Sequence, residues 1–143
     1  MTAVRAAALC GLAAALAWAA FGTGPAAQER GVRLVRDDAQ QRVDVYVDGQ
    51  PFTAYIWPAT QKKPVLFPIR SAKGTPITRG FPLEPRPGER VDHPHHVGLW
   101  FNHGDVNGVD FWNNPESLKP EQAAKMGTIH HRDVASAKGG TGS

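Results

Sequence analysis

The stretch that decides the fold reads Arg42-Val43-Asp44-Val45-Tyr46-Val47-Asp48-Gly49-Gln50-Pro51-Phe52-Thr53-Ala54-Tyr55-Ile56-Trp57. Its first six residues alternate, which places Val43, Val45 and Val47 on one face, and a second β-rich run begins at Phe52. Asp48-Gly49 lies between the two runs. Such a pair favours a two-residue hairpin turn because type I′ turns need positive φ. The stretch therefore predicts an antiparallel β-hairpin.

Short β-like runs flank the hairpin on both sides. The further strands that we expect are residues 32–35, 65–69, 77–81, 97–103, 109–112 and 127–134. Pro68 assigns its run to an edge or a bulge, and the three prolines within residues 82–87 predict an ordered surface loop up to residue 90. Residues 120–125 are the only helical candidate beyond the leader segment. The pattern predicts an all-β fold, an antiparallel β-sandwich of roughly seven strands.

The two ends of the chain differ from this β-rich part. Residues 1–26 combine Arg5, an uncharged run from residue 6 to residue 21 and small residues before a cleavage position, which is the order of a secretory signal peptide. A membrane anchor is the alternative for this segment. Residues 138–143 read as a turn leading into a strand, so we expect residues 27–143 to be the N-terminal part of a longer, incomplete sandwich domain. The protein is then exported, to the periplasm or outside the cell.

Composition excludes several classes of protein. The net charge is +3, and after residue 26 there are 15 Lys and Arg against 13 Asp and Glu, too few positive charges for a strongly basic nucleic-acid binder. No segment after the leader approaches the length of a membrane span. The one cysteine, Cys10, lies in the leader, so a mature chain has no disulfide or thiol nucleophile. The sequence also lacks the glycine-flanked serine of serine hydrolases and a phosphate-binding glycine loop.

The chemistry-bearing residues are concentrated in one segment, which holds four of the six histidines. It reads Asp92-His93-Pro94-His95-His96-Val97-Gly98-Leu99-Trp100-Phe101-Asn102-His103-Gly104-Asp105-Val106-Asn107-Gly108-Val109-Asp110-Phe111-Trp112-Asn113-Asn114. Trp100 and Trp112 offer flat faces to sugar rings, and the asparagines offer donors and acceptors to hydroxyl groups. Alternatively, the indoles belong to the core. His95 or His96 beside Asp92 forms a candidate proton-transfer pair.

Metal binding is a second hypothesis for the same segment. If the chain is extended, His93 and His95 project to one side, His103 shares their parity, and Pro94 helps to keep His93 extended. These three imidazoles, with Asp105 as a carboxylate, are candidate ligands of a divalent metal. The alternative is a hydrogen-bonded scaffold. Residues 105–110 resemble a calcium loop only superficially, and a tight loop with Asx turns is the simpler interpretation.

Four quoted stretches together resemble an exported family labelled PmoA-like. They are Lys63-Pro64-Val65-Leu66-Phe67-Pro68-Ile69-Arg70, Thr78-Arg79-Gly80-Phe81-Pro82-Leu83, Asp92-His93-Pro94-His95-His96 with Gly98-Leu99-Trp100, and Gly104-Asp105-Val106-Asn107-Gly108-Val109-Asp110-Phe111-Trp112. The resemblance implies a large mutarotase-like β-sandwich, a chain continuing beyond residue 143, and carbohydrate ligands. The borrowed label, methane oxygenase PmoA, implies a membrane copper enzyme, which the sequence opposes because nothing after the leader spans a bilayer.

Three functions stay open. The first is an exported protein that binds a carbohydrate or another small molecule, and that is epimerase- or lyase-like if it is an enzyme. The second is a metal-dependent oxygenase or hydrolase, and the third is a non-catalytic accessory module. The catalytic candidates are His95, His96 and Asp92. The ligand-binding candidates are His93, His103, Asp105, Asn107, Asp110, Trp112 and Asn113. The metal candidates are His93, His95 and His103.

Overall fold

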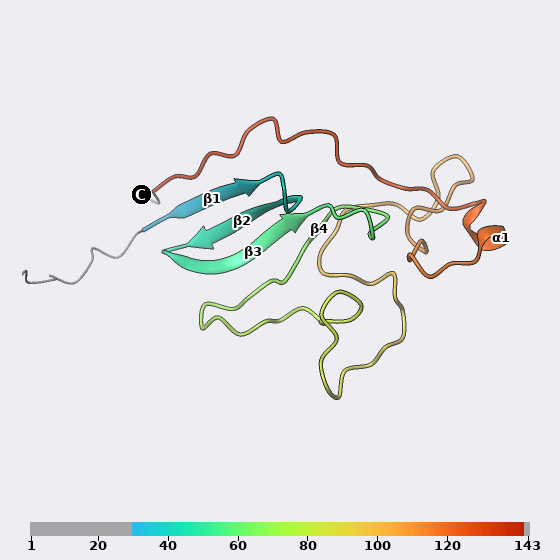
Figure 1. The fold of residues 1–143 in the computed structure, drawn as a ribbon, viewed down its shortest axis with the longest axis horizontal. Helices are drawn as coiled ribbons and strands as arrows, with labels where there is room; N and C mark the ends of the chain where they lie inside the picture. Colours follow the sequence, from blue (N-terminus) through green and yellow to red (C-terminus); the bar gives the residue numbers. More distant parts are fainter. Residues whose placement is uncertain (1–29, 142–143) are drawn as a thin grey trace, which may run out of the picture.

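A computed structural model describes residues 30–141, so the predicted signal peptide lies outside the described residues. One antiparallel sheet in the order β1-β2-β3-β4 dominates the fold (Figure 1). Its strands are β1 (Val32–Asp37), β2 (Arg42–Val47), β3 (Gln50–Ile56) and β4 (Val65–Leu66), and one short helix, α1 (Pro120–Ala123), follows. The predicted all-β class is confirmed. The sandwich stays a prediction, because the described residues form a single sheet.

The predicted hairpin is present between β2 and β3. Val47 pairs with Gln50, and the two turn residues between them have positive φ, 49° at Asp48 and 76° at Gly49. Positive φ at both central positions is the signature of a type I′ turn. The Asp48 carboxylate also accepts a hydrogen bond from the backbone N–H of Gly31, over 2.7 Å, which ties the turn to the start of β1.

β4 is the edge strand of the sheet, as Pro68 predicted, and its outer side makes one further backbone contact. Leu66 and Leu99 exchange two backbone hydrogen bonds, of 2.7 and 3.0 Å. The approach requires Gly98, which has a φ of 56° and whose added Cβ would collide with the carbonyl oxygen of Leu66. This contact brings the histidine-rich segment against the sheet.

The other predicted strands are wrong, for a common reason. Residues 77–81, 97–103, 109–112 and 127–134 form no strand in the described chain. Their backbones make isolated contacts without a continuous ladder, such as the hydrogen bond from Ile129 to the carbonyl of Lys62 or the bridge between Asp110 and Met126. A run of apolar residues supplies a surface for packing, whereas a strand also needs a neighbouring backbone in register.

The remaining expectations on local structure are confirmed in shorter form. Residues 82–90 are an ordered loop, in which the Glu89 carboxylate accepts hydrogen bonds from the backbone N–H groups of Gly80 and Phe81. The helix covers four of the six residues predicted. The C-terminal segment lies beside β1 (Figure 1), where Gly140 pairs with Val32.

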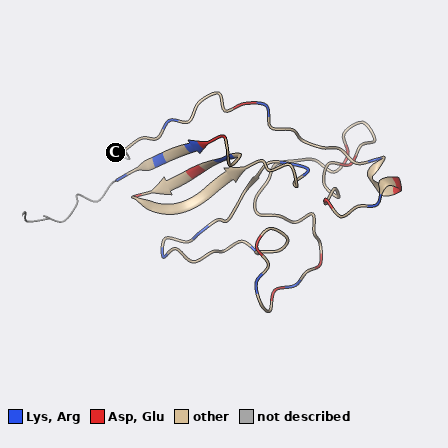
Figure 2. Cartoon of the chain, in the orientation of Figure 1, with Lys and Arg blue, Asp and Glu red and all other residues tan. Residues whose placement is uncertain are grey.

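The core is small and sits where the sheet meets the loops. Val65, Phe67 and Val97 are buried together, and Ile56, Leu83 and Trp100 pack against them. Charged residues of both signs are scattered over β1, β2 and the loops of the described chain, and β3 carries none (Figure 2). Across residues 30–141, no helix has the length and apolar character needed to cross a bilayer.

Candidate functional site

Three of the predicted histidines come together with the two tryptophans, and we call this group the histidine–tryptophan cluster: His93, His95, His96, Trp100 and Trp112. The imidazole centroids of His95 and His96 are 4.3 Å apart, and that of His93 is 5.1 Å from His96 and 5.8 Å from His95. The indole of Trp112 lies edge-to-face with His96 at 6.0 Å and with Trp100 at 4.7 Å. These five residues therefore form one cluster of imidazole and indole rings.

A tight turn, not an extended strand, brings the imidazoles together. His93 has a φ of 49°, and its carbonyl accepts a hydrogen bond of 2.9 Å from the N–H of His96. The prediction that Pro94 keeps His93 extended is wrong, because the turn reverses the chain at this point. The imidazoles are neighbours through the turn, without the alternation of a strand.

Arg79 holds this turn from outside the segment. One guanidinium nitrogen, Nη1, donates to the carbonyl of Asp92 over 2.8 Å and more weakly to that of Arg90, while Nη2 donates to the carbonyls of His93 and His96 over 2.8 and 3.2 Å. Its Nη1 also lies 3.1 Å from the Asp92 carboxylate. A planar fork of donors suits several acceptors at once, so this one side chain fixes the backbone of the turn.

The Asp92 carboxylate interacts with a different histidine from the two that the sequence suggested. Its carboxylate lies 3.1 Å from Nδ1 of His93 and 2.7 Å from Nη2 of Arg90. Partial desolvation opposes ionisation, but the hydrogen bond from His93 and the charges of Arg90 and Arg79 outweigh it and lower the pKa of Asp92. The predicted pairing of Asp92 with His95 or His96 is therefore wrong: the orienting carboxylate belongs to His93.

Trp100 and Trp112 have different environments. Trp100 is half-buried, and it both packs against the core and lines a mainly apolar pocket beside β4, so the choice between core and pocket wall stays open. Trp112 is 40% exposed, at the edge of the cluster. Trp112 is thus the more exposed of the two indoles, and its edge-to-face contact with Trp100 supports it.

Lys63 interacts with both tryptophans of the cluster. The side chain is buried, its Nζ donates to the carbonyls of Phe111 and Trp112 over 3.0 and 2.8 Å, and it lies 4.3 Å from the centre of the Trp100 ring. Burial lowers the pKa of Lys63 to about 8, against a small opposing effect of Asp110. At neutral pH the group is a cation held by two carbonyl dipoles and an aromatic face.

Asp110 and Asn113 bracket the backbone of Trp112. The Asp110 carboxylate accepts hydrogen bonds from the side-chain amide of Asn113 and from the backbone N–H groups of Asn113 and Trp112, over 2.7 to 3.0 Å. The hydrogen bond from the Asn113 side chain, with these amides, lowers the pKa of Asp110. Both predicted polar residues therefore lie beside the backbone of Trp112, where their hydrogen bonds fix the position from which the exposed indole projects.

A pocket of about 370 Å³, lined by both polar and apolar residues, opens beside His95. Its wall includes Lys63, the buried amide of Asn114, and Glu116, whose carboxylate pairs with Lys62 at 2.8 Å. Burial lowers the pKa of His95, and the neighbouring His96, His93 and Lys63 act in the same direction. His95 is the one member of the predicted catalytic set that lines this pocket, and it is neutral at neutral pH.

The remaining predicted residues lie apart from the cluster. The Asp105 carboxylate accepts a hydrogen bond from Gly108, and Asn107, with a φ of 55°, occupies the turn between Val106 and Val109. This is the tight Asx loop that the sequence favoured. His103 is exposed and makes no ring contact with the other histidines in the described chain.

The arrangement does not suit a metal ion. In residues 30–141 no three His, Cys, Asp or Glu side chains are grouped so that they could hold one. The geometric basis of the metal hypothesis fails as well, since His93 is not extended and His103 does not close the set. The imidazoles interact instead with one another, with Asp92 and with Trp112.

Comparison with known sequences places this site within a family. Residues 42–143 match the family described as "Family of unknown function (DUF6807)". The chain belongs to the DUF6807 family. The match includes the whole histidine–tryptophan cluster together with Lys63 and Arg79. No curated protein and no solved structure matches the chain.

Two residues that organise the site in this DUF6807 chain were missed by sequence reasoning. Lys63 stands in a Lys-Lys-Pro sequence typical of an exposed loop, and Arg79 precedes a glycine in a run that suggested a strand. Neither position carries a local signal of its role, because each acts on carbonyl oxygens far along the chain. A third group, Tyr55, Trp57 and His131, also escaped notice: His131 stacks on Trp57 with ring centres 3.9 Å apart.

Proposed function

We propose that this DUF6807 protein binds carbohydrate at the histidine–tryptophan cluster, with the exposed indole of Trp112 as the platform for a sugar ring. The observation that carries the proposal is an exposed indole held rigidly among polar groups. Trp112 is fixed by Trp100, by Lys63 through its carbonyl, and by Asp110 through its N–H. Aromatic faces pack against the C–H surfaces of sugars, and a fixed ring loses little entropy on binding.

The pocket beside His95 adds polar groups next to this platform. A volume of about 370 Å³ lies in the range of sites for small ligands, and its wall offers the Asn114 amide, the Lys62–Glu116 pair and an imidazole. Sugar hydroxyls both donate and accept hydrogen bonds, so they suit a wall of mixed donors and acceptors. We assign the ring of a bound sugar to Trp112 and its hydroxyls, or the next residue of an oligosaccharide, to this pocket.

His95 is the group best suited to chemistry, if the protein is an enzyme. Its lowered pKa keeps the imidazole neutral at neutral pH, so it can accept a proton from a bound sugar. Proton removal is a step shared by epimerase- and lyase-like reactions on carbohydrates. A non-catalytic accessory module would use the same Trp112 platform without this step.

The resemblance to the PmoA-like family supports two further parts of the proposal. It implies a mutarotase-like sandwich, of which the sheet β1–β4 would be one part, and an exported protein. The signal-peptide pattern of residues 1–26 supports export on independent grounds. An exported protein meets polysaccharides outside the cytoplasm, which agrees with a glycan ligand.

A glycan array with matched variants tests the proposal. Trp112→Ala and His95→Ala should lose binding, whereas Trp57→Ala and His130→Ala, which change the same residue types outside the cluster, should retain it. Thermal unfolding of all four variants separates lost binding from lost folding. Equal binding by Trp112→Ala and Trp57→Ala would remove the assignment to the cluster. Catalysis is tested on any glycan retained, by searching for an epimerised or unsaturated product that is absent with His95→Gln, provided that this variant still binds the glycan.

A further inference from the structure

The pocket beside β4 is formed mainly by residues that the proposed function does not use. The register pairs Tyr55 with Leu66, and Leu66 in turn lies opposite Leu99, so these three side chains stand side by side on one face. Phe101 and Ile129 extend the wall, and the pocket has a volume of about 510 Å³. We call these five residues the apolar pocket. Its volume lies in the usual range of small-molecule sites.

Large apolar side chains of this wall are open to solvent. Phe101 is 96% exposed and Leu99 is 55% exposed, and both belong to the segment that reaches the sheet through the backbone pair of Leu99 and Leu66. The N–H of Ile129 donates to the carbonyl of Lys62 over 2.9 Å, which fixes the C-terminal segment at the same wall. Exposed apolar side chains that gather around a hollow mark an interaction site more often than a bare surface.

The charge of the wall limits the ligands that fit. No charged residue of the described chain lines the apolar pocket. The Tyr55 phenol already has a partner, since its oxygen lies 3.3 Å from Nδ1 of His131. Burial raises the pKa of Tyr55, so the phenol carries no charge at neutral pH. A charged ligand would lose hydration here without gaining a partner of opposite charge, so the occupant is uncharged.

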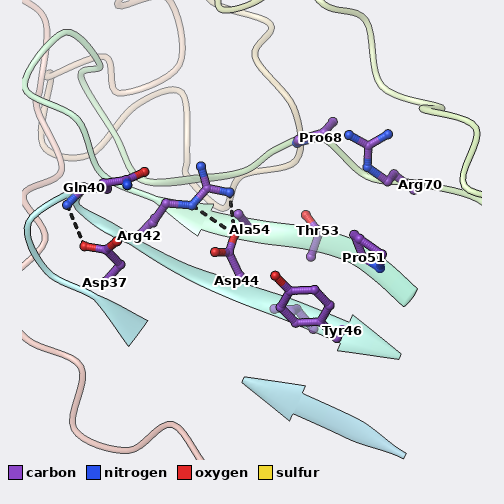
Figure 3. Close-up of a pocket in the computed structure, with 11 residues that line it drawn as sticks. Asp37, Gln40, Arg42, Asp44, Tyr46, Pro51, Thr53, Ala54, Pro68 and Arg70 are labelled. Atoms are coloured by element: carbon purple, nitrogen blue, oxygen red, sulfur yellow. Dashed lines mark hydrogen bonds and ion pairs between the residues drawn. The ribbon is translucent and has the colours of Figure 1, made fainter. Parts of the chain in front are cut away.

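The other face of the sheet is different in kind. Val43 pairs with Tyr55 and Asp44 with Ala54, so the side chains of Asp44 and Tyr55 lie on opposite faces. Figure 3 shows the groove around Asp44, of about 360 Å³, in which Arg42 donates hydrogen bonds to the Asp44 carboxylate. The sheet is therefore amphipathic, and an apolar ligand fits the face that carries Tyr55.

The size of the apolar pocket decides between a small molecule and a second copy of the chain. A stable interface between two proteins takes about 20 residues or more from each side. Eight residues line this pocket, and of the described ones among them only Leu99 and Phe101 are exposed large apolar residues. A second copy needs a wider apolar surface, whereas a small ring system fits the hollow. Tyr55 and Phe101 both offer rings for aromatic contacts.

We propose that the apolar pocket binds an uncharged molecule of linked or fused aromatic rings, which packs against Tyr55, Leu99 and Phe101. Phe101 loses most of its exposure when this ligand is bound. Within residues 30–141 the pocket shares only Trp100 with the histidine–tryptophan cluster. Binding here does not require a sugar at Trp112, so either proposal can fail without the other.

N-phenyl-1-naphthylamine, an uncharged aromatic probe whose fluorescence rises in apolar surroundings, tests the site on the full chain. It should bind saturably, and more tightly than 8-anilinonaphthalene-1-sulfonate, which is the same molecule with a sulfonate group. Leu99→Ser and Phe101→Ser should each weaken binding about tenfold or more, because each removes apolar contact with the probe. Both side chains are exposed, so the variants should fold. Ile77→Ser and Val91→Ser, each at a position 67% exposed and outside the pocket, are the matched controls.

Two further measurements identify the occupant and its place. In two-dimensional NMR the probe should shift the amides of residues 99–101 and 129, and Trp112→Ala should leave its affinity unchanged. Sedimentation velocity should show no dimer that either pocket variant abolishes. Absence of saturable binding, tighter binding of the sulfonate, equal effects of all four serine variants, or a dimer that requires Leu99 and Phe101 would overturn the proposal.

Discussion

Replacement of Lys63 by methionine should destabilise the protein far more than the same change at the adjacent Lys62. The buried ammonium of Lys63 donates to two carbonyls and faces the ring of Trp100. Methionine keeps most of the stem but leaves both carbonyls without their donor. Lys62 pairs only with Glu116, and both of those side chains are partly exposed.

The magnitude follows from three contributions. Two hydrogen bonds from a charged donor contribute about 4 kcal/mol, and the contact with the indole face about 1 kcal/mol. Against them stands the burial of the charge, about 3 kcal/mol, which corresponds to lowering the pKa from 10.5 to about 8. The net loss for Lys63→Met is therefore about 2 kcal/mol, whereas Lys62→Met should cost about 0.5 kcal/mol or less, as for other exposed ion pairs.

The assay is urea unfolding followed by tryptophan fluorescence, because Trp100 and Trp112 both adjoin Lys63. The pH dependence gives a second check. Between pH 8 and 10.5 the unfolded chain holds a proton on this lysine that the folded chain has lost, so this group makes stability rise with pH in that window. The rise should be smaller in Lys63→Met. Equal stabilities of the two methionine variants, with equal pH dependence, would refute the role given to Lys63.

Two further predictions concern the turn that carries the imidazoles. Arg79→Ala should lower the free energy of unfolding by about 2 kcal/mol and broaden the NMR signals of the turn. Arg90→Ala removes an exposed partner of Asp92 and should lower it by at most about 0.5 kcal/mol. Similar losses of stability in the two variants would show that Arg79 does not hold the turn. His95 should titrate below pH 6.5 by NMR, so acidification below that value should destabilise the fold. Because His96 lowers the pKa of His95, His96→Ala should raise that pKa. An unchanged titration midpoint of His95 in this variant would contradict the electrostatic interaction between the two imidazoles.

The sequence was informative where structure is decided locally. Asp48-Gly49 determines the hairpin because its turn depends on the φ preferences of two residues, and the Asx loop after Asp105 follows from a carboxylate three positions before Gly108. The sequence identified the segment in which imidazoles and indoles are concentrated, and five of these rings form one cluster. Its geometry was not, because a left-handed φ at His93 has no signal as clear as a glycine.

The failures share a dependence on distant partners. Whether residues 97–103 form a strand depends on a backbone beside them, and only Leu99 finds one, at Leu66. The burial of Lys63 depends on carbonyls nearly fifty positions away, and Arg79 likewise acts through residues 90–96. The periodicity of apolar residues and the composition contain no information on such pairings. Lys63 and Arg79, which lie in apparent loops or strands, were therefore not predicted to organise the site.

The central claim is that the exposed indole of Trp112 is the surface on which a sugar binds. The most direct measurement is the indole N–H signal of each tryptophan in two-dimensional NMR during titration with the oligosaccharides retained on the glycan array. We expect the Trp112 signal to move in a saturable way, with His95 responding alongside, while Trp57 stays fixed. A saturable shift of Trp57 with Trp112 unmoved, or no shift of either indole with any of these glycans, would contradict the account.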